Sequence, residues 1–142
     1  MQITRQADYA VRAMVYLAQL GQDQLGQNKR AATGKIAQEK CIPPSFLAKI
    51  VSQLSVAGLL QTSRGAHGGV SLAKPAKAIS LLDVVVAIDG PILLNDCVGE
   101  FSSCKYDESC PQKSIWCEAQ KMLVDHLSKA NFGQFAEVAP IG

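Results

Sequence analysis

The chain lacks any long apolar run, although 48% of its 142 residues are hydrophobic. The longest apolar stretch, 81–88, is interrupted by Asp83 and falls far short of the ~18 residues that cross a bilayer. The opening Met-Gln-Ile-Thr-Arg-Gln has no apolar core of a signal peptide. We therefore expect a cytoplasmic protein with no membrane partner, large enough for one globular core.

Catalytic and nucleotide-binding signatures are also missing. The sequence holds two histidines, neither in a recognisable catalytic context, and no paired acid and base. The glycine-rich stretch 65–69 lacks the Gly-Lys-Ser/Thr ending and the strand–helix context of a phosphate-binding loop. We predict that the protein is not an enzyme.

The charge is small overall, at +2, but unevenly distributed. Residues 1–80 carry ten Lys and Arg against three acidic residues, and residues 81–142 carry four Lys against nine acidic residues. A basic half followed by an acidic half is typical of a nucleic-acid-binding module joined to a regulatory module. Chance scatter of surface charge is the alternative.

The apolar spacing of the basic half predicts two helices before residue 41. An amphipathic helix spans 8–20, and a polar connector, 21–32, follows it. Thr33 can then cap a short helix that runs to about Lys40. Thr33 and Lys35 lie at the beginning of this helix, where they are candidates for holding DNA phosphates.

A stiff turn and a third helix follow. The prolines at 43 and 44 restrain the backbone, and either Pro44 or Ser45 can open a helix that Gly58 ends. Two short helices joined by a tight turn form a helix-turn-helix, in which the second helix enters the major groove. The candidate reading residues are Pro44, Ser45, Phe46 and Lys49.

Two short β-type runs come next, at 59–63 and 70–72, and they flank a glycine-rich tip. This pattern predicts a hairpin wing beside the helix-turn-helix. Its large polar groups are Arg64 and His67, and Arg64 could enter a narrow minor groove. We therefore assign residues 1–80 to a winged helix-turn-helix DNA-binding domain, in a fold that is mainly α with a small β-hairpin wing.

The acidic half, residues 81–142, is predicted to be a cluster-binding loop and a dimerisation helix. Ser80 and Asp83 resemble a capping box that opens a helix to Ile88. A long helix from Pro111 to about Ala130 follows an aperiodic loop, and it is too long for so small a domain to cover alone. We expect its exposed apolar face to form a homodimer seam, and the tail after residue 131 to be loosely ordered.

Four of the five cysteines fall within twenty-one residues, at gaps of six, five and six. These even gaps suit an iron–sulfur cluster better than a zinc knuckle, which needs closely spaced ligands. A thiol–disulfide switch, a zinc site and simple packing remain alternatives. The fifth, Cys41, is expected in the core. The clustered residues are Cys97, Cys104, Cys110 and Cys117.

Several of these motifs, in this order along nearly the whole chain, resemble the bacterial Rrf2 family of winged-helix regulators. They are Asp8-Tyr9-Ala10, Ile42-Pro43-Pro44-Ser45-Phe46-Leu47, the wing glycines, and Cys97…Cys104…Cys110-Pro111…Trp116. The resemblance implies a homodimer that binds double-stranded promoter DNA. It also implies that the long C-terminal helices cross at the seam, with a cluster held near the partner's first helix.

The resemblance also implies a ligand set. Cys97, Cys104 and Cys110 match the three thiolate ligands of the family, and the fourth ligand varies among its members. In the nitric-oxide sensors it is an Asp of the partner's first helix with an Arg one turn on, which here are Asp8 and Arg12. Cys117 is the alternative fourth ligand.

The assembly regulators of the family carry a histidine ligand where this chain has Lys113. The pattern therefore favours the nitric-oxide sensors, and three thiolates with one interfacial ligand favour a 4Fe-4S over a 2Fe-2S cluster. We expect a cluster-dependent repressor that senses nitric oxide, redox state or iron and cluster status. The alternatives are a cluster-free thiol- or ligand-responsive regulator of the same fold and a small iron–sulfur carrier.

Overall fold

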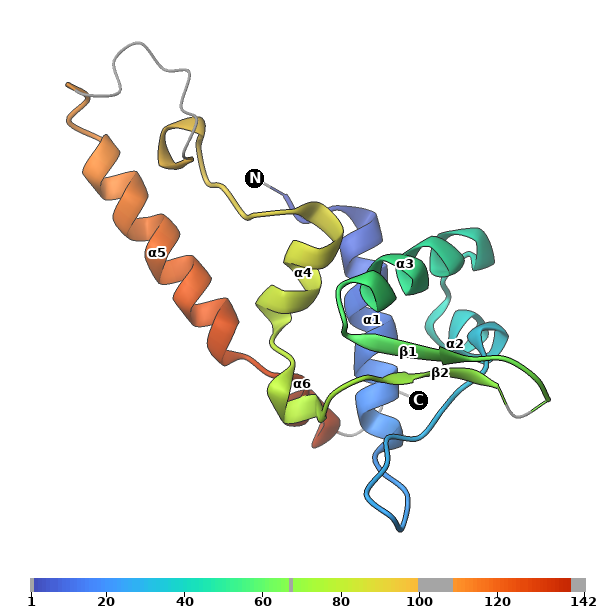
Figure 1. Ribbon diagram of the computed structural model, residues 1–142. Helices are drawn as coiled ribbons and strands as arrows, with labels where there is room; N and C mark the ends of the chain where they lie inside the picture. The colour runs from blue at the N-terminus through green and yellow to red at the C-terminus, as the bar shows by residue number, and fades with distance from the viewer. Residues whose placement is uncertain (1, 67, 100–108, 139–142) are drawn as a thin grey trace.

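The computed structural model describes residues 2–66, 68–99 and 109–138, and these residues form helices and one antiparallel hairpin. Figure 1 shows α1 at the centre, the helix-turn-helix and hairpin on one side, and α5 on the other. The mainly α fold with a small β-hairpin wing is therefore confirmed. In chain order the elements are α1 Arg5–Leu20, α2 Thr33–Lys40, α3 Pro44–Val56, β1 Leu60–Ser63, β2 Gly69–Leu72, η1 Ala76–Ala78, α4 Leu81–Asp89, η2 Asp96–Val98, α5 Lys113–Lys129 and α6 Phe132–Ala136.

Helix α1 is the axis of the core. Thr4 caps it by accepting a hydrogen bond from the Ala7 amide, so the helix begins three residues earlier than the sequence pattern predicts. The small side chains on its buried face allow α3, α4 and α6 to approach closely. That face consists of Ala7, Ala10, Ala13, Met14, Leu17 and Ala18.

The helix-turn-helix is present with two local differences from expectation. Ala32, not Thr33, is the N-cap of α2, and no side chain caps it, so Thr33 is the first helical residue. Cys41 occupies the turn with a left-handed φ of 53° and is exposed, so its assignment to the core was wrong. Pro44 opens α3 at its first turn, as predicted.

The hairpin places Leu60 opposite Leu72 and Thr62 opposite Val70. The buried side chains of its inner face are Leu60, Val70 and Leu72. The loop that follows α1 joins the hairpin through an antiparallel β-bridge between Ala31 and Val70. The predicted wing is therefore present, anchored by its apolar face to the helical core.

Helix α4 begins with the predicted capping box, in which Ser80 accepts from the Asp83 amide and the Asp83 carboxylate accepts from the Ser80 amide. The expectation of a loose tail was wrong for residues 132–136, because α6 folds back onto α1, whereas residues 139–142 lie outside the described residues. Phe132 is fully buried there, and a second capping box, formed by Asn131 and Gln134, begins α6. The alternation of polar and apolar residues in so short a helix gave no clear periodic signal.

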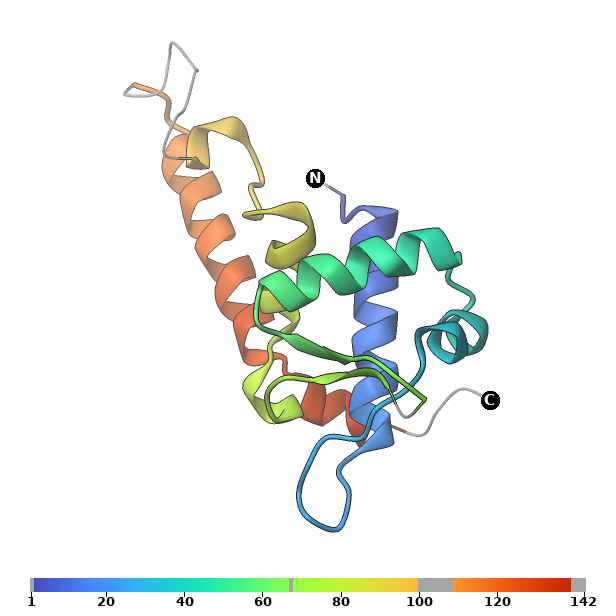
Figure 2. The same ribbon diagram turned by 45° about the vertical axis from the view of Figure 1, so that its right-hand side comes forward.

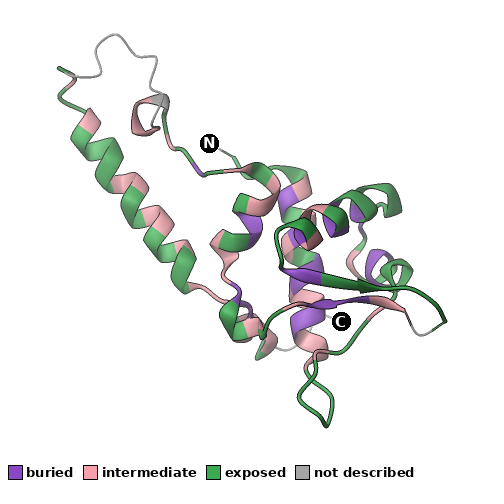
Figure 3. Cartoon of the chain, in the orientation of Figure 1, coloured by how far each residue is buried: buried purple, intermediate pink, exposed green. Residues whose placement is uncertain are grey.

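Helix α5 stands apart from the core, as Figures 1 and 3 show. None of its residues is buried, and Ile115 and Met122 are each 65% exposed. Its C-terminal end is attached where the Leu81 amide donates to the Ala130 carbonyl. In the described ranges of the chain, no helix is long and apolar enough to cross a membrane. The division at residue 80 stays a prediction.

Candidate nucleic-acid interface and cysteine site

The predicted reading residues lie on an open face of α3. Ser45, Phe46 and Lys49 are exposed, whereas the opposite face is buried in the core. Lys49 lies one turn after Ser45 and so shares its side of the helix. Phe46 is 45% exposed, so it is available to a partner instead of being a full member of the core. The arrangement matches a helix presented to a DNA groove.

The beginning of α2 offers a second set of DNA-facing groups. Thr33 and Lys35 are exposed, and Lys35 lies 4.0 Å from Glu39 in an ion pair one turn away. No side chain caps α2, and its Lys35 and Ile36 amides donate to the Ala32 carbonyl, so the positive end of the helix dipole lies beside Thr33 and Lys35. A helix N-terminus of this kind favours a phosphate group.

The structure describes one of the two candidate DNA-binding residues of the wing. Arg64 is exposed where β1 ends, at the tip of the hairpin. A Cβ at Gly68 would collide with the Ser63 carbonyl, so glycine is needed for the chain to turn back so tightly. His67 lies outside the described residues.

A continuous series of contacts joins Asp8 to the reading helix. The Asp8 carboxylate lies 2.7 Å from the Arg12 guanidinium, and Arg12 Cζ lies 5.3 Å from the Tyr9 ring centroid. Tyr9 meets Phe46 edge to face, with centroids 5.9 Å apart. The sequence places Tyr9 in the amphipathic helix and in the Asp8-Tyr9-Ala10 motif, but no local pattern marks it as the link between α1 and α3.

Two of the candidate cysteine ligands lie near the N-terminal end of α5. Cys97 is on η2 and Cys110 precedes α5, and both are half-buried. Figures 1 and 2 show η2 beside the beginning of α5. Cys117, on α5 itself, is exposed, and Cys104 lies outside the described residues.

Gln120 fixes the segment before η2 onto α5. Its Oε1 accepts from the Leu94 amide at 2.9 Å, and its Nε2 donates to the Ile92 carbonyl. This contact satisfies two backbone groups of an otherwise irregular segment and so places Cys97 near the beginning of α5. The sequence did not single out Gln120, because the two positions that it joins are 26 and 28 residues away.

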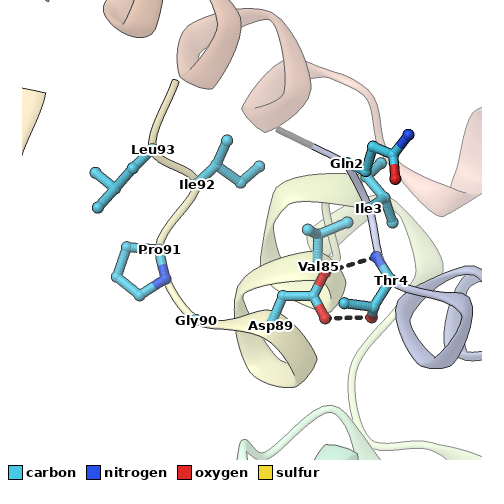
Figure 4. A pocket seen from close by; sticks show the side chains of 9 residues that line it. All are labelled: Gln2, Ile3, Thr4, Val85, Asp89, Gly90, Pro91, Ile92 and Leu93. Carbon is cyan, nitrogen blue, oxygen red and sulfur yellow. Dashed lines mark hydrogen bonds between the residues drawn. The ribbon is translucent and has the colours of Figure 1, made fainter. Parts of the chain in front are cut away.

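A second long-range contact joins the two halves of the chain (Figure 4). The Asp89 carboxylate accepts from the Thr4 amide at 3.2 Å and from the Thr4 hydroxyl at 2.5 Å. The segment toward Cys97 therefore leaves α4 next to the beginning of α1, around a cavity of about 280 Å³. No sequence pattern links residues 85 apart.

The metal-ligand set is not complete among the residues that the structure describes in one chain. In those ranges, no three His, Cys, Asp or Glu side chains gather closely enough to hold a metal ion. Asp8, with 54% of its side chain exposed, is on α1 and forms its ion pair with Arg12. Two half-buried thiols beside an exposed helix fit a thiolate-ligated group that draws further ligands from elsewhere.

A helix-turn-helix followed by a hairpin wing defines a winged-helix DNA-binding protein. Residues 3–137 match the model of the Rrf2 family, described as an iron-dependent transcriptional regulator, and the chain belongs to that family. It is therefore a DNA-binding transcription regulator and not an enzyme, as the sequence predicted. Rrf2 regulators bind DNA, typically as dimers.

Solved structures are similar over almost the whole chain. CymR (YrzC), the global cysteine regulator of B. subtilis, matches with a TM-score of 0.78 and 21% identity, covering 99% of both chains. The oxidised form of Staphylococcus aureus CymR matches at 0.74 and 26%, again covering 99% of both. T. potens IscR matches at 0.70 and 22%, covering 99% of this chain and 93% of that one. The fold is thus shared with both CymR and IscR.

Proposed function

We propose that this regulator is a cytoplasmic, homodimeric repressor whose affinity for promoter DNA depends on an iron–sulfur cluster. The observation that carries the proposal is the pair of half-buried thiols, Cys97 and Cys110, at one end of a helix with no buried residue. Such a helix requires a partner to cover its apolar face, and the partner can complete the ligand set.

The proposed ligands are Cys97, Cys104 and Cys110 of one subunit and the partner subunit's Asp8, with Cys117 as the alternative fourth ligand. Arg12 would orient the carboxylate through the contact that it already makes with Asp8. A bound 4Fe-4S cluster would supply irons that react with nitric oxide or oxidants and that are lost when iron is scarce. The ligand chemistry favours nitric oxide, redox state or iron and cluster status as the signal.

The contacts of α1 suggest how the signal reaches DNA. A displacement of Asp8 would disturb Arg12, then Tyr9, and then Phe46 on the reading helix. Because Phe46 lies in the first turn of α3, a small rotation there would change the fit of Ser45 and Lys49 to the major groove. A tenfold change in DNA affinity needs only about 1.4 kcal/mol of differential binding.

Anaerobic purification tests the cluster directly. We expect brown protein with sulfide, about four irons per subunit and thiolate-to-iron absorption. Exposure to nitric oxide should bleach that absorption and release promoter DNA in a gel-shift titration. Colourless air-free protein without iron or sulfide, which still responds to its signal, would refute the proposal.

The dimer seam can be tested on α5. Met122→Glu places a charge on the exposed apolar face and should convert the dimer to a monomer, because burying an unpaired carboxylate is costly. Lys121→Glu introduces the same residue at the neighbouring exposed position and should leave the dimer intact. Light scattering after size exclusion measures the mass. A dimeric Met122→Glu protein would place the seam elsewhere.

The wing contact predicts a different change. Arg64→Ala should weaken promoter binding and lower the slope of log affinity against log salt by about one unit, because one phosphate or groove contact is lost. Lys129→Ala, on the exposed side of α5, removes the same charge and should change neither quantity. An unchanged salt slope for Arg64→Ala would remove this residue from the interface.

A second candidate function is a cluster-free thiol switch. The similarity to Staphylococcus aureus CymR, solved in an oxidised form, favours it, as do the exposed thiols of Cys41 and Cys117. In this case metal-free protein would bind DNA, and mild oxidants would reverse the binding. Serine replacement of the reacting thiol would abolish that response and leave the absorption spectrum featureless.

A further inference from the structure

A polar cleft of about 410 Å³ lies between the hairpin and the 22–30 loop. Arg30 and Lys74 supply positive charge, while Gln61 and Ser71, paired across the two strands, supply neutral polar groups. No Asp or Glu is among the described residues that line this cleft. Lys74 can therefore donate to an anion in the cleft, whose described lining has no carboxylate to repel one.

The loop that closes the cleft is held in place by its own hydrogen bonds. Asn28 Nδ2 donates to the Leu72 and Lys74 carbonyls at 2.9 and 3.0 Å. The Asp23 carboxylate accepts from the Leu25 and Gln27 amides at 2.8 and 2.9 Å, so its charge serves the loop itself. A cleft formed in advance loses little conformational freedom when a ligand binds.

An apolar cavity adjoins the polar cleft. It also measures about 410 Å³, lies between the end of α1, η1 and α6, and shares Gln22, Asn28, Leu72 and Pro75 with the cleft. Its lining is mainly apolar and includes Leu17, Ala76 and Ala136, with Lys77 and Glu137 as its two charged residues. Polar and apolar spaces of this size, side by side, have the character of a small-molecule site.

We propose that the two cavities together bind a small organic anion with an apolar tail. The carboxylate would lie in the basic cleft near Lys74, and the tail would lie against Ala76 and Ala136. A DNA phosphate matches the charge of the cleft but has no apolar part to fill the second cavity, so the small molecule fits better. Because Leu72 is on β2 and Ala136 is on α6, the ligand would contact the wing and the C-terminal helix at once. Because the wing is part of the proposed DNA interface, the bound ligand would change DNA binding without any involvement of the cysteines.

Titration of octanoate into the isotope-labelled dimer, followed by amide NMR, tests this site. We expect saturable shifts at Gln22, Gln61 and Gly133, and an affinity about tenfold higher than that of acetate or octanol, which each lack one half of the ligand. Lys74→Gln should weaken octanoate about tenfold, through loss of a charge-assisted contact. Lys129→Gln on α5 should not change it.

Ala136→Leu supplies a second, independent variant, because it partly fills the apolar cavity. It should weaken octanoate and leave the weak binding of acetate unchanged. Shifts confined to α5, or no effect of Lys74→Gln, would overturn the proposal. Binding of inorganic phosphate without octanoate, together with weaker DNA binding by Lys74→Gln, would assign the cleft to the DNA backbone instead. Repeating the titration with Cys97→Ser protein keeps this result separate from the fate of the cluster.

Discussion

Cys97→Ser or Cys110→Ser should purify under anaerobic conditions without iron and sulfide. A serine hydroxyl does not ionise near neutral pH, so it replaces a thiolate ligand poorly. Loss of an outer-shell partner alone costs about 10–100-fold in metal affinity, and loss of a ligand should cost more. Iron and sulfide assays, with the absorption spectrum, measure the effect, and promoter binding should lose its dependence on nitric oxide.

The chain contains its own controls for this experiment. Cys41→Ser changes an exposed thiol in the helix-turn-helix and should keep the full iron content. Cys117→Ser and Asp8→Ala decide between the two candidates for the fourth ligand, since only one of them should lower iron occupancy. Retention of iron by both Cys97→Ser and Cys110→Ser would exclude the proposed cysteine site.

Phe132→Ala should lower the free energy of unfolding by about 3–5 kcal/mol, the range for removing a buried aromatic ring. Phe132 is fully buried against α1 and stacks edge to face on Phe135 with centroids 5.3 Å apart. Urea unfolding at fixed protein concentration measures the change. Val138→Ala, at a residue that is 61% exposed, should cost little. Equal stability of the two variants would show that α6 contributes no packing to the core.

Elements with a strong periodic pattern could be predicted from the sequence. The spacing of α1 and α3, the proline turn, and the capping box at Ser80 each reflect local physics that a few neighbouring residues determine. The hairpin was predicted from two short β-type runs on either side of a glycine-rich tip. These elements carry the proposed DNA-binding residues, except His67, which lies outside the described residues.

What the sequence did not reveal depends on contacts between distant residues. The Thr4–Asp89 and Gln120–Leu94 bonds join positions that no period connects, and the short α6 gains its stability from the pocket that receives Phe132. Cys41 looked apolar from its neighbours, but the left-handed turn directs it to solvent. The cysteine ligands follow from residue type and family resemblance, and their assembly stays a prediction.

The attachment of α5 has a mechanical consequence. Gln120, near the middle of α5, ties the helix to the segment after α4, and the Ala130 carbonyl ties its C-terminal end to the Leu81 amide. A neighbouring molecule that displaces α5 would therefore act both on the segment that leads to Cys97 and on the beginning of α4.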